Sequence, residues 1–307
     1  MLNVNELSYP LLLDGGLSNQ LEFQGHDLND PLWSAKLMAE DPAAIYEAHL
    51  AYLQAGAQIL ITASYQASIQ GFKNRLGVDK NKAEELLFLT TQVARDAIQK
   101  FREENQDASP RYVAASIGPY GAYLADGSEY HGNYGVSNET LTDFHRERLD
   151  ILARSEPDFL ACETIPSFQE ASVLSELLKE YNIPAWISFS CMDDVKINDE
   201  ARFSVAIQLF KDHPTIFALG VNCTAPEHVT SLIRIAKSEL PEKKVIVYPN
   251  SGEVFDAETK TWSGLNDTHI CAMMSNEWLN AGADIVGGCC RIGPKHIAAI
   301  RSIIESR

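Results

Sequence analysis

The chain has 307 residues, of which 45% are hydrophobic and 22% are charged, as is usual for a soluble globular protein. Its formal charge of −17 disfavours nucleic acid and anionic membranes as partners, because both require a basic surface. No apolar stretch approaches the roughly 18 residues that cross a bilayer, and no secretory leader opens the chain, so we expect a cytoplasmic protein.

Short apolar runs alternate with helical patterns along the chain. Eight runs are predicted as strands, at residues 11–14, 59–64, 112–117, 159–163, 185–190, 217–222, 244–248 and 285–288. The runs are continuously apolar, which indicates a parallel sheet buried on both faces. Eight strand–helix units predict an α/β fold, a single (β/α)8 TIM barrel domain over residues 1–307. An open doubly wound sheet is the alternative topology.

The predicted helices follow the strands, and several of their starts carry boundary signals. Apolar residues recur at helical spacing over residues 43–54, 83–100, 141–153 and 168–179. Two pairs have the spacing of a capping box, namely Ser167 with Glu170 and Thr224 with Glu227. Pro294 stands where a first-turn proline is expected.

Two connections are longer than usual, and both follow strands at the predicted carboxyl face of the barrel. Residues 118–137 contain Tyr120, Tyr123, Tyr130 and Tyr134, and residues 251–264 contain Phe255 and Trp262. Long aromatic connections on that face often act as lids or substrate walls. A packed surface excursion is the alternative interpretation.

Three of the six cysteines stand at predicted strand ends. Cys223 ends the sixth strand, and Cys289 with Cys290 ends the eighth, so one strand separates them and their sulfurs can converge. Three soft thiolates favour zinc and leave a fourth tetrahedral position open, as in catalytic sites. Buried core thiols or a strained redox pair remain the alternatives. The other cysteines are predicted to be ordinary core or near-surface residues: Cys162, Cys191 and Cys271.

Two carboxylates also stand at strand ends, Asp14 after the first strand and Glu163 after the fourth. Acids bind an ammonium group, and the backbone amides of Gly15 and Gly16 can bind a carboxylate, so this face can hold an amino acid by its head. Each carboxylate can instead be a helix cap or a satisfied polar group. No dinucleotide fingerprint, P-loop or serine elbow occurs in the chain.

Seven segments spread over nearly the whole chain carry a more specific signal. They are DGG at residues 14–16, ASYQAS at 63–68, IGPYGAYLADGS at 117–128, ETIP at 163–166, GVNCT at 220–224, YPNSG at 248–252 and GGCCR at 287–291. With these segments the chain resembles the homocysteine S-methyltransferase family, whose members are (β/α)8 barrels with a zinc site of one cysteine after the sixth strand and two after the eighth.

The resemblance implies a role for each candidate residue. Cys223, Cys289 and Cys290 are the expected Zn²⁺ ligands. The expected substrate-binding residues for L-homocysteine are Asp14 and Glu163 for its ammonium group, Gly15 and Gly16 for its carboxylate, and Asn222 and Thr224, which flank a metal ligand and orient it. Tyr120 and Tyr123 are the expected wall for the methyl donor. No protein catalytic group is expected beyond the zinc site.

The resemblance also indicates the donor. The segment at residues 120–128 and the element that begins at Trp33 are most similar to the branch that uses S-methylmethionine. Gln66 stands where the betaine-using branch has a tyrosine, which disfavours betaine and leaves a betaine-type donor as the alternative. The expected reaction is therefore methyl transfer from S-methylmethionine or S-adenosylmethionine to L-homocysteine, which forms methionine.

Two other functions remain open at this point. A zinc-binding or thiol redox-sensing protein would explain the cysteines, and a metal-free barrel lyase would use Glu163 as a base. Turnover of homocysteine separates the first from the methyltransferase, and metal dependence separates the second. No sequence feature indicates the oligomeric state.

Overall fold

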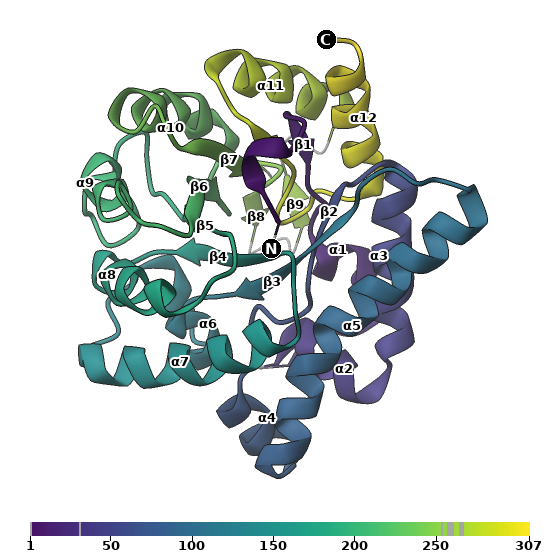
Figure 1. The fold of residues 1–307 in the computed structure, drawn as a ribbon, viewed down its shortest axis with the longest axis vertical. Coiled ribbons are helices and arrows are strands. Elements are labelled where there is room, and N and C mark those ends of the chain that lie inside the picture. Colours follow the sequence, from purple (N-terminus) through teal and green to yellow (C-terminus); the bar gives the residue numbers. More distant parts are fainter. Residues whose placement is uncertain (1, 31, 253, 257–260, 264–266) are drawn as a thin grey trace.

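Eight parallel strands form the centre of the computed structural model, which describes residues 2–30, 32–252, 254–256, 261–263 and 267–307 (Figure 1). The strand order is β1-β10-β7-β6-β5-β4-β3-β2, and a parallel bridge between Leu13 and Ile59 joins β1 to β2. The strands are β1 (Leu11–Leu12), β2 (Ile59–Ile61), β3 (Tyr112–Ile117), β4 (Phe159–Ile165), β5 (Ala185–Phe189), β6 (Ile216–Asn222), β7 (Lys244–Tyr248) and β10 (Ile285–Val286). The predicted (β/α)8 barrel is confirmed.

Helices surround the strands in the order that a barrel requires (Figure 1). The α-helices are α1 (Leu17–Phe23), α2 (Leu37–Glu40), α3 (Pro42–Ala55), α4 (Ile69–Leu76), α5 (Lys80–Asn105), α6 (Tyr120–Leu124), α7 (Asn138–Arg154), α8 (Phe168–Leu177), α9 (Phe203–Gln208), α10 (Pro226–Glu239), α11 (Thr268–Ala281) and α12 (Pro294–Glu305). Short 3-10 turns are η1 (Val4–Glu6), η2 (Trp33–Lys36), η3 (Ser128–Tyr130) and η4 (Leu178–Glu180).

The apolar strands divide their side chains between two cores. Leu11 and Leu13 belong to the cluster inside the barrel, whereas Leu12 belongs to the larger cluster between the barrel and its helices. This alternation is the period of two that a strand imposes, with both faces apolar. Trp186 belongs to the inner cluster and is among the largest fully buried side chains of the described residues.

One of the three helix-start predictions is confirmed, since Pro294 begins α12. The capping box at Ser167 and Glu170 is only half present: the Ser167 hydroxyl accepts from the Glu170 amide at the start of α8, but the Glu170 carboxylate accepts from Tyr120 and Tyr134 instead. The prediction for Thr224 is wrong, because α10 has Ala225 as its N-cap. The Thr224 hydroxyl is already used: it accepts from the Cys191 amide and donates to the Asn222 carbonyl.

Both long connections contain structure of their own. Residues 118–137 form α6 and η3, and residues 251–264 include the antiparallel pair β8 (Val254–Asp256) and β9 (Thr261–Ser263). The side chains of Phe255 and Trp262 lie outside the described part of the chain, as do residues 253, 257–260 and 264.

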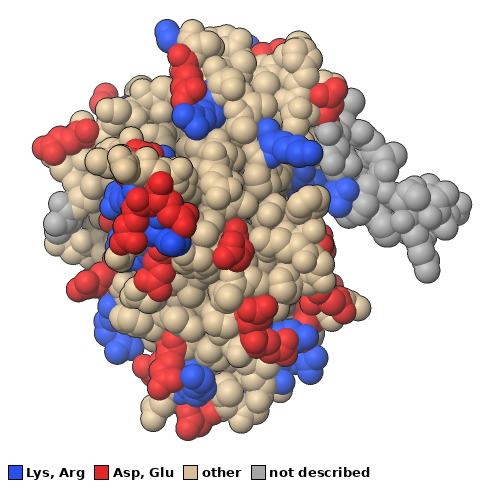
Figure 2. All heavy atoms as spheres, turned by 90° about the vertical axis from the view of Figure 1, so that its right-hand side faces the viewer, with Lys and Arg blue, Asp and Glu red and all other residues tan. Residues whose placement is uncertain are grey.

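Acidic and basic side chains are interspersed on the face shown in Figure 2. Many are paired across helices or within one turn, such as Lys100 with Glu104 at 2.8 Å. Within the described ranges, no helix combines the length and apolarity that a bilayer-spanning segment needs.

Candidate functional site

Three cysteine sulfurs meet at the carboxyl face of the barrel, as the sequence predicts. Cys223 follows β6 directly, and Cys289 and Cys290 follow β10, with all three sulfurs within 4.8 Å of one another. The sulfurs of Cys223 and Cys290 are 3.7 Å apart. Cys223 has a φ of +49°, a left-handed conformation that turns the chain sharply at the strand end.

The spacing and chemistry of these thiols fit a soft metal ion. Two thiolates at about 2.3 Å from a tetrahedral zinc ion stand about 3.8 Å apart, close to the observed separation. Without a cation, hydrogen bonds between the clustered sulfurs, then burial and charge repulsion, raise the pKa values of Cys223 and Cys289, whereas hydrogen bonds from those thiols lower the pKa of Cys290. A divalent ion would remove the repulsion and hold all three as thiolates.

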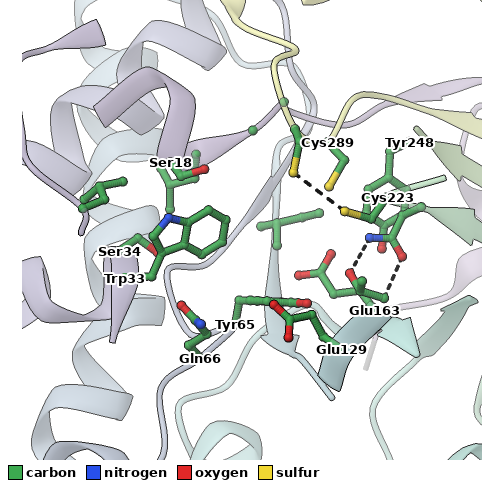
Figure 3. Close-up of a pocket in the computed structure, with 18 of the residues that line it drawn as sticks. Ser18, Trp33, Ser34, Tyr65, Gln66, Glu129, Glu163, Cys223, Tyr248 and Cys289 are labelled. Atoms are coloured by element: carbon green, nitrogen blue, oxygen red, sulfur yellow. Dashed lines mark hydrogen bonds between the residues drawn. The ribbon is translucent and has the colours of Figure 1, made fainter. Parts of the chain in front are cut away.

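The sulfurs face a cavity of about 570 Å³ that is open to solvent (Figure 3). Its size lies within the range of about 300–1,000 Å³ that is usual for ligand sites. Its described lining includes the carboxylates of Asp30, Glu129 and Glu163 but no lysine, arginine or histidine. Such a cavity favours cationic ligands over anionic ones.

Glu163 lines this cavity from β4 and is 6% exposed. Burial raises the pKa of its carboxyl group to about 7, and hydrogen bonds from Ser116 and Tyr248 limit the increase. An ammonium group that binds beside this buried carboxyl group would supply a countercharge and so favour its ionised form.

Asp14 and the two glycines occupy the end of β1, but they differ in their access to the cavity. Asp14 is 1% exposed and absent from the described lining; its Oδ2 accepts from the Ile61 amide at 2.8 Å. Burial and the nearby Glu163 raise the pKa of Asp14 well above its usual range. Gly15 and Gly16 do line the cavity, but the Gly16 amide donates to the Ile292 carbonyl at 2.9 Å. Of the two amides, only that of Gly15 is left for a ligand carboxylate.

Asn222 and Thr224 flank Cys223, and their polar side-chain groups form hydrogen bonds within the protein. The Asn222 amide exchanges hydrogen bonds of 2.7 Å with Thr164 and also accepts from Ser188 at 2.8 Å, which ties β4, β5 and β6 together. Asn222 reaches the cavity wall, whereas Thr224 does not. Both therefore fix the backbone around Cys223.

The aromatic wall of the cavity differs from the one expected from the sequence. Neither Tyr120 nor Tyr123 belongs to the described lining; Tyr120 packs edge-on against Phe144 at 5.0 Å between ring centroids. The rings that do line the cavity are Trp33, Tyr65, Tyr130 and Tyr248. The pKa of Tyr130 is raised chiefly by the negative charge of Cys223, which places its phenol near the sulfurs.

Two buried polar side chains that support the site have no signal in the sequence. The Tyr52 hydroxyl, on α3, donates to the carbonyls of Gly16 and Ile292 at 2.8 and 3.1 Å and so joins the ends of β1 and β10. Arg148, on α7, donates to the carbonyls of Gly118, Ser64 and Tyr65 at 2.9 to 3.1 Å. Both residues fall at apolar-facing positions of helices, where sequence patterns predict only core packing.

Comparisons with known proteins agree with this geometry. Residues 11–304 match the family model described as homocysteine S-methyltransferase. The chain is 45% identical to homocysteine S-methyltransferase YbgG of Bacillus subtilis, over 97% of this chain and 96% of that one. It is 43% identical to homocysteine S-methyltransferase of Escherichia coli, over 95% and 94% of the two chains.

A solved structure gives the same result for the fold. The metallated form of the homocysteine methyltransferase MmuM from Escherichia coli superimposes with a TM-score of 0.87 at 40% identity, covering 97% of this chain and 98% of that one. That structure contains a metal, and the described part of this chain has a three-cysteine cluster of the kind that holds one.

Proposed function

We propose that this chain, which belongs to the homocysteine S-methyltransferase family, transfers a methyl group from S-methylmethionine or S-adenosylmethionine to L-homocysteine and so forms methionine. The observation that carries the proposal is the convergence of three thiols on a cavity lined by carboxylates and by no described basic residue. A thiol-binding metal and two cationic amino-acid substrates suit such a cavity.

Zn²⁺ is the proposed metal, with Cys223, Cys289 and Cys290 as its ligands. Bound there, zinc supplies Lewis acidity that favours the thiolate form of a substrate thiol at neutral pH. The protein contributes the three sulfurs from strand ends, so their positions depend on backbone hydrogen bonds of the barrel. One of these joins the Cys289 amide to the Pro249 carbonyl at 2.8 Å.

The homocysteine head group is proposed to bind at the ends of β1 and β4. Glu163 accepts from the ammonium group, and the Gly15 amide donates to the carboxylate. Asp14 does not contact the ligand: burial and the nearby Glu163 disfavour its ionised form, which a bound ammonium group would stabilise. This placement points the side-chain sulfur of homocysteine toward the cysteine cluster.

The methyl donor is proposed to lie against the rings of Trp33, Tyr65 and Tyr130. Aromatic faces attract sulfonium and ammonium cations, and a close fit aligns the two sulfurs with the transferred methyl group. A bond forms between the homocysteine sulfur and this methyl carbon while the carbon–sulfur bond of the donor breaks. The electron pair of that bond leaves with a neutral thioether, so no protein acid is needed.

Methionine formation tests this proposal. The protein, with its zinc content assayed, is incubated with homocysteine and each of three donors: S-methylmethionine, S-adenosylmethionine and betaine. We expect turnover with a sulfonium donor and none with betaine. Zinc-loaded protein that uses no donor would contradict the proposal, and turnover with betaine alone would contradict the donor assignment.

A further inference from the structure

Glu129 differs from the paired Asp30, because no ion pair to its carboxylate is present among the described residues. Asp30 is paired with Arg75, whose two guanidinium nitrogens lie 2.9 and 2.7 Å from Oδ2. Glu163 has the proposed role of binding the homocysteine ammonium. Glu129 is half-buried, and its Oε2 is inaccessible to solvent without a hydrogen-bond partner among the described residues.

The surroundings of Glu129 do not supply a strong countercharge. Burial raises the pKa of its carboxyl group, the nearby Asp126 raises it further, and the exposed His131 lowers it by less. Its own amide and that of Gly127 also interact with the carboxylate. Burying an unpaired carboxylate is unfavourable, so such groups are normally paired with a cation. A cationic ligand in the cavity that Glu129 lines would supply this pairing.

Glu129 is also held in place before any ligand binds. It lies in η3, where the Gly132 amide donates to the Ser128 carbonyl at 2.9 Å. Gly121 of α6 packs so closely that a Cβ there would stand 2.4 Å from the Glu129 nitrogen. Buried Glu170 fixes both flanks of this segment: it accepts from the Tyr120 amide at 2.6 Å and from the Tyr134 hydroxyl at 2.8 Å.

Glu129 comes from a different part of the chain than the residues proposed to bind the homocysteine head group. Glu163 lies in β4 and Gly15 follows β1, whereas Glu129 belongs to the connection after β3, next to Tyr130. In Figure 3 Glu129 is drawn beside Tyr65, on the side of the cavity opposite Cys289. Two carboxylates from different parts of the chain thus line the cavity besides the paired Asp30: Glu129 after β3 and Glu163 in β4.

We propose that Glu129 binds the α-ammonium group of the methyl donor and so selects a donor that is itself an amino acid. This inference rests on the proposed function and adds a specificity-determining residue to it. A dimethylsulfonium donor with an α-amino group would place one cation near the rings and the other at Glu129. Betaine has no second cation for this carboxylate.

The test compares Glu129→Gln with wild type on two donors, S-methylmethionine and the same dimethylsulfonium carboxylate without its α-amino group. A charge-assisted hydrogen bond corresponds to an effect of about 10- to 100-fold, so kcat/KM for S-methylmethionine should fall by that factor through KM. With the des-amino donor, wild type and variant should be equal. The homocysteine KM and the zinc content should not change.

Glu139→Gln is the matched control, because it removes one exposed carboxylate from the start of α7 and leaves the cavity intact. An unchanged kcat/KM for S-methylmethionine in Glu129→Gln would overturn the inference. Equal losses on both donors would also do so, as would an increase confined to the homocysteine KM.

Calorimetry keeps this test independent of turnover. S-methylmethionine is titrated into zinc-loaded wild type and Glu129→Gln, and a dissociation constant raised by about 10- to 100-fold in the variant supports the inference. Equal binding, or no binding to wild type, would overturn it. Absence of turnover in wild type would contradict the proposed function separately.

Discussion

The strand-end groups and the connection at residues 118–137 face the same cavity but are held there by different interactions. Cys289 and Cys290 are fixed by backbone hydrogen bonds: the Cys289 amide donates to Pro249, and Cys290 accepts from the Ser251 amide at 3.1 Å. The connection depends on buried side chains of α7 and α8, above all Arg148 and Glu170. Side-chain substitutions should therefore loosen the connection while the strand-end groups stay in place.

Removal of a sulfur from the cluster should have the largest effect. We expect Cys290→Ser to lose bound zinc and to lower methionine formation by more than about 100-fold, because two thiolates do not complete the metal site. The fold should persist, since the sulfur belongs to the cavity wall. Metal analysis, activity and circular dichroism measure the three outcomes.

Cys271→Ser is the control for this substitution, because Cys271 lies in α11 outside the cluster. It should keep its zinc and its activity. A fully active Cys290→Ser protein without metal would break the assignment of the cluster.

Loss of the Glu163 charge should have the next largest effect. Glu163→Gln should raise the KM for homocysteine by about 10- to 100-fold, because a charged hydrogen bond to the ammonium group is lost. The KM for the donor should change little, since Glu129 is unaltered. An unchanged homocysteine KM in steady-state kinetics would show that the ammonium group binds elsewhere.

The pH dependence of stability should report on the same carboxyl group. Burial raises the Glu163 pKa from 4.5 to about 7, so the folded state favours the protonated form. The stability that Glu163 contributes is present below the unfolded pKa and is lost as the pH rises through about 7. In the metal-free wild type, this carboxyl group should lower the free energy of unfolding by about 2–3 kcal/mol between pH 5 and 8, as measured with urea. The Glu163→Gln variant should lack this contribution to the decrease. Parallel curves for the two proteins would contradict this.

Weakening the support of the connection should have a smaller and more selective effect. Glu170→Gln removes the charge that accepts from Tyr120, Tyr134 and His145. We expect the unfolding free energy to fall by about 1–3 kcal/mol and the donor KM to rise several-fold, with zinc content and homocysteine KM unchanged. Loss of zinc in this variant would show that the two regions are not held separately.

The smallest change should come from Tyr134→Phe, which removes one hydroxyl from the same network. One hydrogen bond to a charged group is lost, and we expect about 1–2 kcal/mol less unfolding free energy in urea. The donor KM should change less than in Glu170→Gln. A larger effect than in that variant would indicate a direct role of the ring in binding.

The difference between groups held by the backbone and a connection held by side chains also explains what the sequence could predict. The eight strands and the three convergent cysteines could be predicted, because apolar runs locate the strands and a barrel collects their carboxyl ends at one face. Residues 112–117 and 244–248 were predicted with the bounds that the structure has for β3 and β7.

The contacts of individual side chains could not be predicted, because a polar side chain can form hydrogen bonds with any group that the fold brings near it. The spacing of Ser167 and Glu170 indicates a capping box, and the Ser167 part is present, but the Glu170 carboxylate bonds to Tyr120 and Tyr134 instead of the cap. Thr224 has a capping position in the sequence, yet its hydroxyl bonds to the Cys191 amide. Within residues 118–137, four tyrosines were visible and only the fold shows that Tyr130 reaches the cavity.

Zinc removal and return test the central claim most directly. Protein stripped of metal with a chelator is titrated with Zn²⁺, and methionine formation from homocysteine and S-methylmethionine is followed at each step. The account predicts no activity without metal and a linear recovery that ends at about one zinc ion per chain, the capacity of one three-cysteine site. Full activity in the metal-free protein would contradict it.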